Sequence, residues 1–153
     1  MQHLEITLNK SSRLPLSDKR KEIMMEVIIY LFITLFMYTA ASKILTIDKF
    51  TSTLGKSPLI GSYNVIVGWA VPVVEILISL LLVVPAFRKW GLYASFGLMT
   101  FFTLYLAYMV LSGNELPCNC GGVISTMTWQ QHIWFNLGFV LLAIAGLILH
   151  KKK

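Results

Sequence analysis

The sequence predicts an all-α integral membrane protein built as a four-helix bundle. Four apolar runs are each close to the roughly 20 residues that a helix needs to cross the hydrocarbon layer. The 153-residue chain is 56% hydrophobic and 13% charged, which is outside the range of an ordinary soluble domain. Its net charge of +6 does not indicate nucleic-acid binding, because Lys and Arg collect at the ends of the apolar runs, where lipid headgroups lie. A single membrane domain in the lipid bilayer is therefore expected.

The chain begins with a polar, basic segment, residues 1–22, which we expect to lie at the surface or to be disordered. Met24 or Met25 could be the natural start, since the apolar sequence begins there. The membrane domain is expected over residues 23–150, followed by a basic tail at 151–153.

The four spans are predicted at about residues 25–44, 62–84, 90–111 and 131–149. A cleaved signal peptide is the alternative for the first span, but its apolar run is longer than a usual signal sequence has. Residues 45–61 are expected to be a polar connection, with Gly55 and Pro58. The short turn at 85–89 predicts that the second and third spans are antiparallel neighbours.

Orientation is predicted from the distribution of Lys and Arg. Ten of the 13 lie on the side of the two termini, three lie in the first loop, and the loop between the third and fourth spans has none. The positive-inside rule therefore places both termini in the cytoplasm. In a bacterial inner membrane the last loop then faces the oxidising side, where disulfides persist.

That last loop contains both cysteines of the chain, in Pro117-Cys118-Asn119-Cys120-Gly121-Gly122. Cysteines two apart can come within the roughly 4.4–6.8 Å between α carbons that a disulfide requires. The ring closed in this way is small and strained, and an exposed, strained disulfide is easily reduced. The proline and the two glycines suit a tight turn around the pair. We therefore predict a redox loop in which Cys118 and Cys120 are the reacting residues.

Glu75 lies near the middle of the second span, where an ionisable group costs roughly 2.5–3.5 kcal/mol on insertion scales. It is expected to face the bundle interior, next to a kink at Pro72 that frees the carbonyl of Gly68. Two interpretations remain open: a proton- or cofactor-contacting site, or a paired side chain that locks helix packing. Lys43, at the end of the first span, is expected to snorkel outward rather than bend toward Glu75. Glu26 is expected to be solvated at the cytoplasmic interface.

His132 and Asn136 share one helix face directly after the cysteine loop. A histidine close to a thiol can lower its pKa and favour the attacking thiolate. The alternative is an ordinary hydrogen-bonding residue at the headgroup level. No metal site is predicted, because Cys118, Cys120 and His132 supply three ligands and structural zinc needs four.

The order of these features resembles the MauE/DoxX family of small four-helix membrane proteins, specifically its MauE-like branch, over about residues 25–149. In the family pattern Cys-x-Cys is followed by Phe-Gly and later by Arg-Asn; here Gly121-Gly122 and Phe135-Asn136 take those places. The residues that carry the resemblance are Ala40-Ala41-Ser42-Lys43, Phe50, Leu54, Pro72, Glu75, Arg88, Cys118-Asn119-Cys120-Gly121 and Asn136.

The resemblance implies a redox-associated protein, linked in its namesake to methylamine dehydrogenase maturation alongside a thioredoxin-like accessory protein. Cys118 and Cys120 would then exchange disulfides with an exported thioredoxin-fold partner, and a quinone could complete the electron path. Two alternatives stay open. The bundle could be a non-enzymatic assembly partner with a static disulfide, or a small transporter that uses Glu75 and forms a homo-oligomer to enclose its pathway.

Overall fold

The computed structural model describes residues 2–113 and 128–151, with side chains from residue 18 onward except that of Trp129. Every regular element in these ranges is a helix, which confirms the predicted all-α class. The elements in chain order are α1 (Gln2–Leu45), α2 (Ile47–Gly55), the 3-10 turn η1 (Gly61–Tyr63), α3 (Asn64–Val83), the 3-10 turn η2 (Pro85–Phe87), α4 (Arg88–Leu111) and α5 (Trp129–Lys151).

Four of these helical stretches are long and apolar enough to cross a membrane, which confirms the four predicted spans. They are Asp18–Leu45, Gly61–Val83, Pro85–Leu111 and Gln130–Lys151. Helix α1 begins at Gln2 and so includes most of the polar segment 1–22, which we expected to lie at the surface or to be disordered. Because the number of crossings is even, both ends of the membrane domain lie on one side, and α2 lies on the other.

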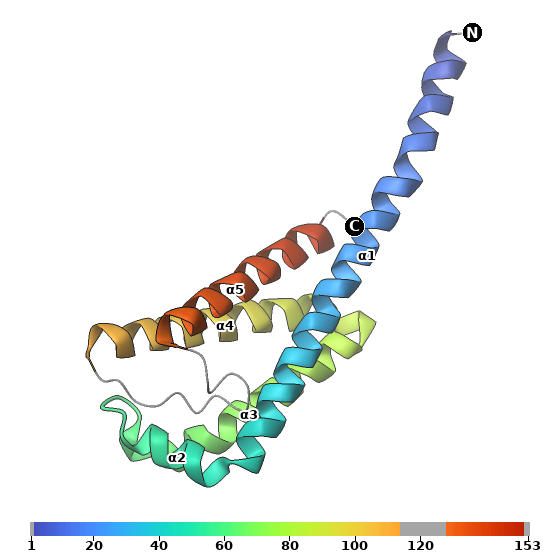
Figure 1. Cartoon of the computed structure of the whole chain (residues 1–153). Coiled ribbons are helices and arrows are strands. Elements are labelled where there is room, and N and C mark those ends of the chain that lie inside the picture. Colours follow the sequence, from blue (N-terminus) through green and yellow to red (C-terminus); the bar gives the residue numbers. More distant parts are fainter. Residues whose placement is uncertain (1, 114–127, 152–153) are drawn as a thin grey trace.

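The spanning helices that follow one another in the chain pack side by side (Figure 1). Helix α1 packs against α3, α4 packs against α5, and α3 and α4 are neighbours, as the short turn between them predicted. Helix α5 also contacts α1, which closes the bundle. Lipid tails are as apolar as leucine, so these contacts stabilise the bundle through close packing rather than through exclusion of water.

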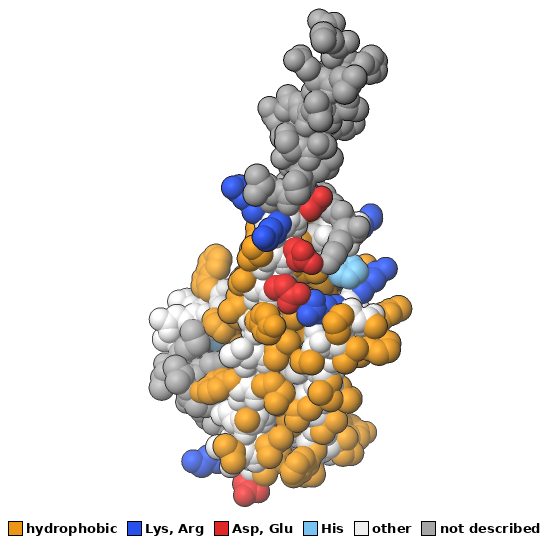
Figure 2. All heavy atoms as spheres, turned by 90° about the vertical axis from the view of Figure 1, so that its right-hand side faces the viewer, with side chains coloured by type: hydrophobic (Ala, Val, Ile, Leu, Met, Phe, Trp, Pro, Cys, Tyr) orange, Lys and Arg blue, Asp and Glu red, His pale blue; other side chains and the backbone are white. Residues whose placement is uncertain are grey.

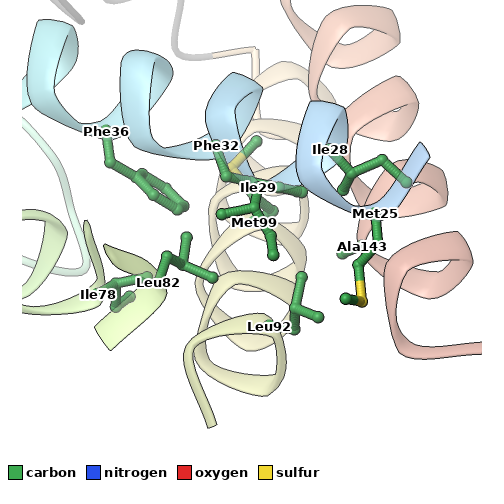
Figure 3. Packing of buried hydrophobic residues seen from close by; sticks show 10 residues of the cluster. All are labelled: Met25, Ile28, Ile29, Phe32, Phe36, Ile78, Leu82, Leu92, Met99 and Ala143. Carbon is green, nitrogen blue, oxygen red and sulfur yellow. The ribbon is translucent and has the colours of Figure 1, made fainter. Parts of the chain in front are cut away.

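The core lies between α1, α3, α4 and α5 (Figure 3). Phe32, Leu82 and Leu92 are completely buried in it. A side chain at Gly91 would meet the Leu82 side chain at 2.8 Å, so this glycine permits the close approach of α4 to α3 after the turn. The cluster consists of Met25, Ile28, Ile29, Phe32, Phe36, Ile78, Leu82, Leu92, Met99 and Ala143.

The outer surface is largely apolar, unlike that of a soluble protein. Large apolar side chains are exposed along all four spans, and Figure 2 shows them as a band between two ends that carry the charged side chains. Trp90 and Trp134, near the starts of α4 and α5, are mostly exposed. These two starts lie at opposite ends of the bundle, which agrees with aromatic belts at both lipid interfaces.

The predicted polar connection at 45–61 contains a helix, α2, that the sequence did not reveal. Its Phe50 and Leu54 lie four residues apart on one face and are buried. Thr51 packs onto α3 at Gly68, where a β carbon would meet the threonine methyl at 2.5 Å. The side chain of Asn64 also donates a hydrogen bond to the Thr51 carbonyl at 3.2 Å. Helix α2 therefore folds back onto the first half of α3.

On the side of the termini, Arg88 at the start of α4 binds Glu26 of α1. Both terminal nitrogens of the guanidinium group donate to the carboxylate. The Glu26 side chain is one-third exposed, so the expectation that it is solvated is only partly correct. This ion pair ties α1 to α4 at the level where the charged side chains gather.

Candidate functional site

A buried ion pair lies inside the membrane domain. The Nζ of Lys43 in α1 lies 2.7 Å from Oε1 of Glu75 in α3. The two side chains are only 5% and 1% exposed. An unpaired charge would be very costly in such surroundings, and here each charge has its counterion on the facing helix.

The expectation that Lys43 snorkels outward is wrong. Its ammonium group turns inward because three features stabilise it there: the Glu75 carboxylate and the faces of two aromatic rings. The Nζ lies 5.9 Å from the ring centroid of Phe50 in α2 and 5.7 Å from that of Phe102 in α4. An ammonium group within about 6 Å of a ring face is attracted by the ring quadrupole. Four helices thus converge on one group.

The second oxygen of the Glu75 carboxylate, Oε2, is buried and has no hydrogen-bond partner among the residues that the structure describes. Thr39, one turn before Lys43 on α1, is buried and lies close to this carboxylate. Pro72 lies inside α3 one turn before Glu75 and is itself buried. Proline has no N–H to donate, so the carbonyl of Gly68 loses its intrahelical partner at the level of this site.

Helix α5 contributes two further buried polar groups. His132, in the first turn of α5, is 6% exposed and lies within electrostatic range of Lys43. Asn136 is one turn further along the same face and is 5% exposed. These two residues share one helix face, as predicted, but the cysteines near which they were expected lie outside the described residues. The interpretation of His132 as a residue at the headgroup level is not supported, because its side chain is buried.

A hydrogen bond joins α4 to the chain after α2. The hydroxyl groups of Tyr105 and Ser57 lie 3.1 Å apart, and Ser57 is buried. Tyr105 is one turn beyond Phe102 on α4. The third span therefore contributes a polar contact as well as apolar packing.

The predicted redox residues, Cys118 and Cys120, lie outside the described residues. Their segment joins the end of α4 to the start of α5, which both lie on the same side of the bundle as α2. His132 is three residues after the start of α5, a rise of about 4.5 Å along the helix. His132 and the cysteine segment therefore lie at the same end of the bundle.

The site combines side chains that can exchange protons with two aromatic side chains, Phe50 and Phe102, that can pack against a ring. Lys43, Glu75 and His132 are titratable, and one carboxylate oxygen is open to a further donor. Among the described residues, no group of three or more His, Cys, Asp and Glu side chains could hold a metal ion. The sequence did not identify Phe50 and Phe102 as site residues. The signal for Phe50 was its i, i+4 spacing with Leu54, and Phe102 carries no comparable signal in an aromatic-rich span.

These features define a multi-pass membrane protein with four spanning helices and a buried polar site at the end of the bundle from which a Cys-x-Cys segment departs. Comparison with family models identifies it further: the model described as methylamine utilisation protein MauE matches residues 21–149. The chain belongs to the MauE family. No curated protein and no solved structure matched the chain in the same comparisons.

Proposed function

We propose that the protein is a membrane thiol-disulfide redox protein, in which Cys118 and Cys120 exchange a disulfide with an exported thioredoxin-fold partner. The observation that carries the proposal is the position of the chain's two cysteines, separated by a single residue, between two membrane-spanning helices of a MauE-family protein. The family description favours a membrane-associated role in methylamine utilisation.

The chemistry is one exchange through a mixed disulfide. A thiolate of the partner attacks one sulfur of the Cys118–Cys120 disulfide, and the other sulfur leaves as a thiolate. The partner's second thiolate then attacks the mixed disulfide, which leaves the partner oxidised and both cysteines of this chain reduced. The strain of the small ring that this disulfide closes favours this direction, because a strained disulfide is a stronger oxidant.

The setting that we propose is a bacterial inner membrane with the cysteine segment on the outer side. The Lys and Arg distribution supports this orientation, since Lys19, Arg20, Lys21, Arg88 and Lys89 all lie on the side of the termini. An exported thioredoxin-fold protein would then meet the cysteines directly, on the side where disulfides persist.

Trapping the mixed disulfide tests the proposal. In the Cys118→Ser and Cys120→Ser variants, the one remaining thiolate can attack the disulfide of the oxidised partner, which is the reverse of the exchange above, and no second cysteine is present to close a ring and release that partner. One variant should accumulate a covalent complex with a thioredoxin-fold protein, which appears as a band that disappears on reduction. The double Cys118→Ser, Cys120→Ser variant is the matched control and should give no such band.

The same variants separate exchange from a static disulfide. If neither single variant forms a covalent complex, and both retain the function of the original chain, the cysteines are a structural clip and the exchange proposal is wrong. If function is lost only in a Glu75→Gln variant while the cysteine variants stay active, the transport alternative is favoured instead.

A further inference from the structure

On the side of the termini, the ends of α4 and α5 lie next to each other. Gly146 of α5 lies against Leu92 of α4 and Ile28 of α1, because a β carbon on this glycine would be 3.1 Å from Cδ2 of Leu92 and 3.4 Å from Cγ2 of Ile28. Arg88 and His150 are each one helical turn from these contacts in the direction of the termini. The first turn of α4 and the last turn of α5 are therefore neighbours.

Two lysines in these neighbouring turns carry charge that the protein does not neutralise. Lys89 and Lys151 are both exposed, and neither forms an ion pair within the part of the chain that the structure describes. Arg88 differs, because its guanidinium group is already bound to Glu26. Neither the first turn of α4 nor the last turn of α5 contains Asp or Glu. Two positive charges thus come together without a counterion.

The exposed face of α4 continues from Lys89 toward the hydrocarbon layer. Trp90 is 67% exposed and Tyr93 is 51% exposed, and their N–H and O–H groups suit the boundary where lipid ester and phosphate oxygens lie. One turn further, a β carbon on Gly97 would have no described residue within 4 Å beyond its own helical neighbours. This face therefore leaves room for an acyl chain between Tyr93 and Phe101. Figure 2 shows basic side chains gathered immediately beyond the apolar band.

A partner for this surface needs a negative group and an apolar chain in one molecule. A free anion satisfies the lysines but not the apolar face beside them, and a nucleic acid cannot follow that face into the hydrocarbon. We propose that Lys89 and Lys151 together bind the phosphate group of an anionic phospholipid, whose acyl chains lie along α4. The inference goes beyond the thiol-disulfide function, because it involves neither the cysteines nor the buried ion pair.

The local charge favours an anionic over a zwitterionic headgroup. A zwitterionic lipid brings its own ammonium group to a place where Lys89 and Lys151 are already positive, so part of the attraction to its phosphate is cancelled. Each lysine next to an anionic lipid contributes a factor of about five to the affinity, or about 25 for two. Lys19 and Arg20 lie roughly 10 Å beyond Glu26 along α1, so they attract an anionic surface without reaching the same lipid.

Native mass spectrometry of the purified, delipidated full chain tests the site. Phosphatidylglycerol, which is anionic, and phosphatidylcholine, which is zwitterionic, are titrated separately against the protein in a neutral detergent. We expect one phosphatidylglycerol molecule to bind about tenfold or more tightly than phosphatidylcholine. Inorganic phosphate in millimolar excess should not displace it, because free phosphate has no acyl chain to pack on α4.

Paired variants locate the binding. Lys89→Gln with Lys151→Gln should weaken phosphatidylglycerol binding about 25-fold and leave phosphatidylcholine binding unchanged. Lys89→Arg with Lys151→Arg keeps both charges and should keep the affinity. The matched control is Lys49→Gln with Lys56→Gln, which removes two exposed lysines on the opposite side of the bundle and should leave the affinity unchanged.

Equal affinity for the two lipids, or an equal loss in the two glutamine pairs, overturns the site, because the attraction is then to overall charge. Displacement by inorganic phosphate also overturns it, because the lysines then bind a free anion. If the Lys89→Gln, Lys151→Gln chain fails to fold, the salt dependence of the original chain decides. Phosphatidylglycerol binding should fall as salt is raised, and binding that is insensitive to salt overturns the proposal.

Discussion

Lys43 and Glu75 are 32 residues apart in the chain and form an ion pair in which Nζ and Oε1 are 2.7 Å apart. The pair joins the end of the first spanning helix to the middle of the second, and both side chains are almost completely buried. A buried ion pair is weak evidence of net stability, because desolvation of both charges offsets their attraction. Removal of only one partner, however, leaves an uncompensated charge, and the energetic consequences can be measured.

Lys43→Met should destabilise the protein by about 3–5 kcal/mol, because the Glu75 carboxylate then stays buried without its cation. The measurement is the free energy of unfolding by titration of a denaturing detergent into mixed micelles. The matched variant replaces both partners, Lys43→Met together with Glu75→Leu. It should recover most of the lost free energy of unfolding, because no charge then stays buried without its counterion. Equal destabilisation in the single and double variants would show that the ion pair is not the relevant interaction.

Gly68→Ala should destabilise the contact between α2 and α3, because the new β carbon would lie 2.5 Å from the Thr51 methyl. Overpacking of this kind typically costs about 1–3 kcal/mol. Thr51→Ser removes that methyl and keeps the hydroxyl that donates to the Ile47 carbonyl at 2.9 Å. The double variant should therefore be close to the original chain in its free energy of unfolding. No rescue by Thr51→Ser would mean that α2 does not pack on Gly68.

Arg88→Gln should have a small effect, roughly 0–1 kcal/mol, because the Glu26–Arg88 pair is partly exposed. The effect should shrink further as salt is raised, since exposed charges are screened within about 10 Å at 0.1 M salt. The effect of Lys43→Met, whose partner is buried, should change much less over the same salt range. Unfolding measured at low and high salt compares the two pairs, and a strong salt dependence of the Lys43→Met effect would contradict the buried position.

Much of the fold could be predicted from the sequence, because apolar length alone specifies a spanning helix. The four spans, the antiparallel pairing of α3 and α4, and the helix face shared by His132 and Asn136 follow from hydropathy, loop length and helical period. Helix α2 was missed because its nine residues carry only two buried apolar positions, Phe50 and Leu54, within a polar segment.

The site was predicted only in part, and the reason is physical. A lysine near the end of a span has two favourable environments, the headgroup layer and a buried carboxylate, and the sequence does not show which is closer. The choice depends on the crossing of α1 and α3 and on the rings of Phe50 and Phe102, which come from helices far apart in the chain. Such contacts between distant segments carry no local sequence signal.

The redox state and exposure of Cys118 and Cys120 in intact cells test the central claim most directly. A membrane-impermeant thiol reagent is applied before and after mild reduction, with the double Cys118→Ser, Cys120→Ser variant as control. Labelling that appears only after mild reduction is the predicted result, because it requires a labile disulfide on the outer side of the membrane. Thiols that stay unlabelled under both conditions in intact cells, yet react once the membrane is opened, would contradict the outward-facing redox loop.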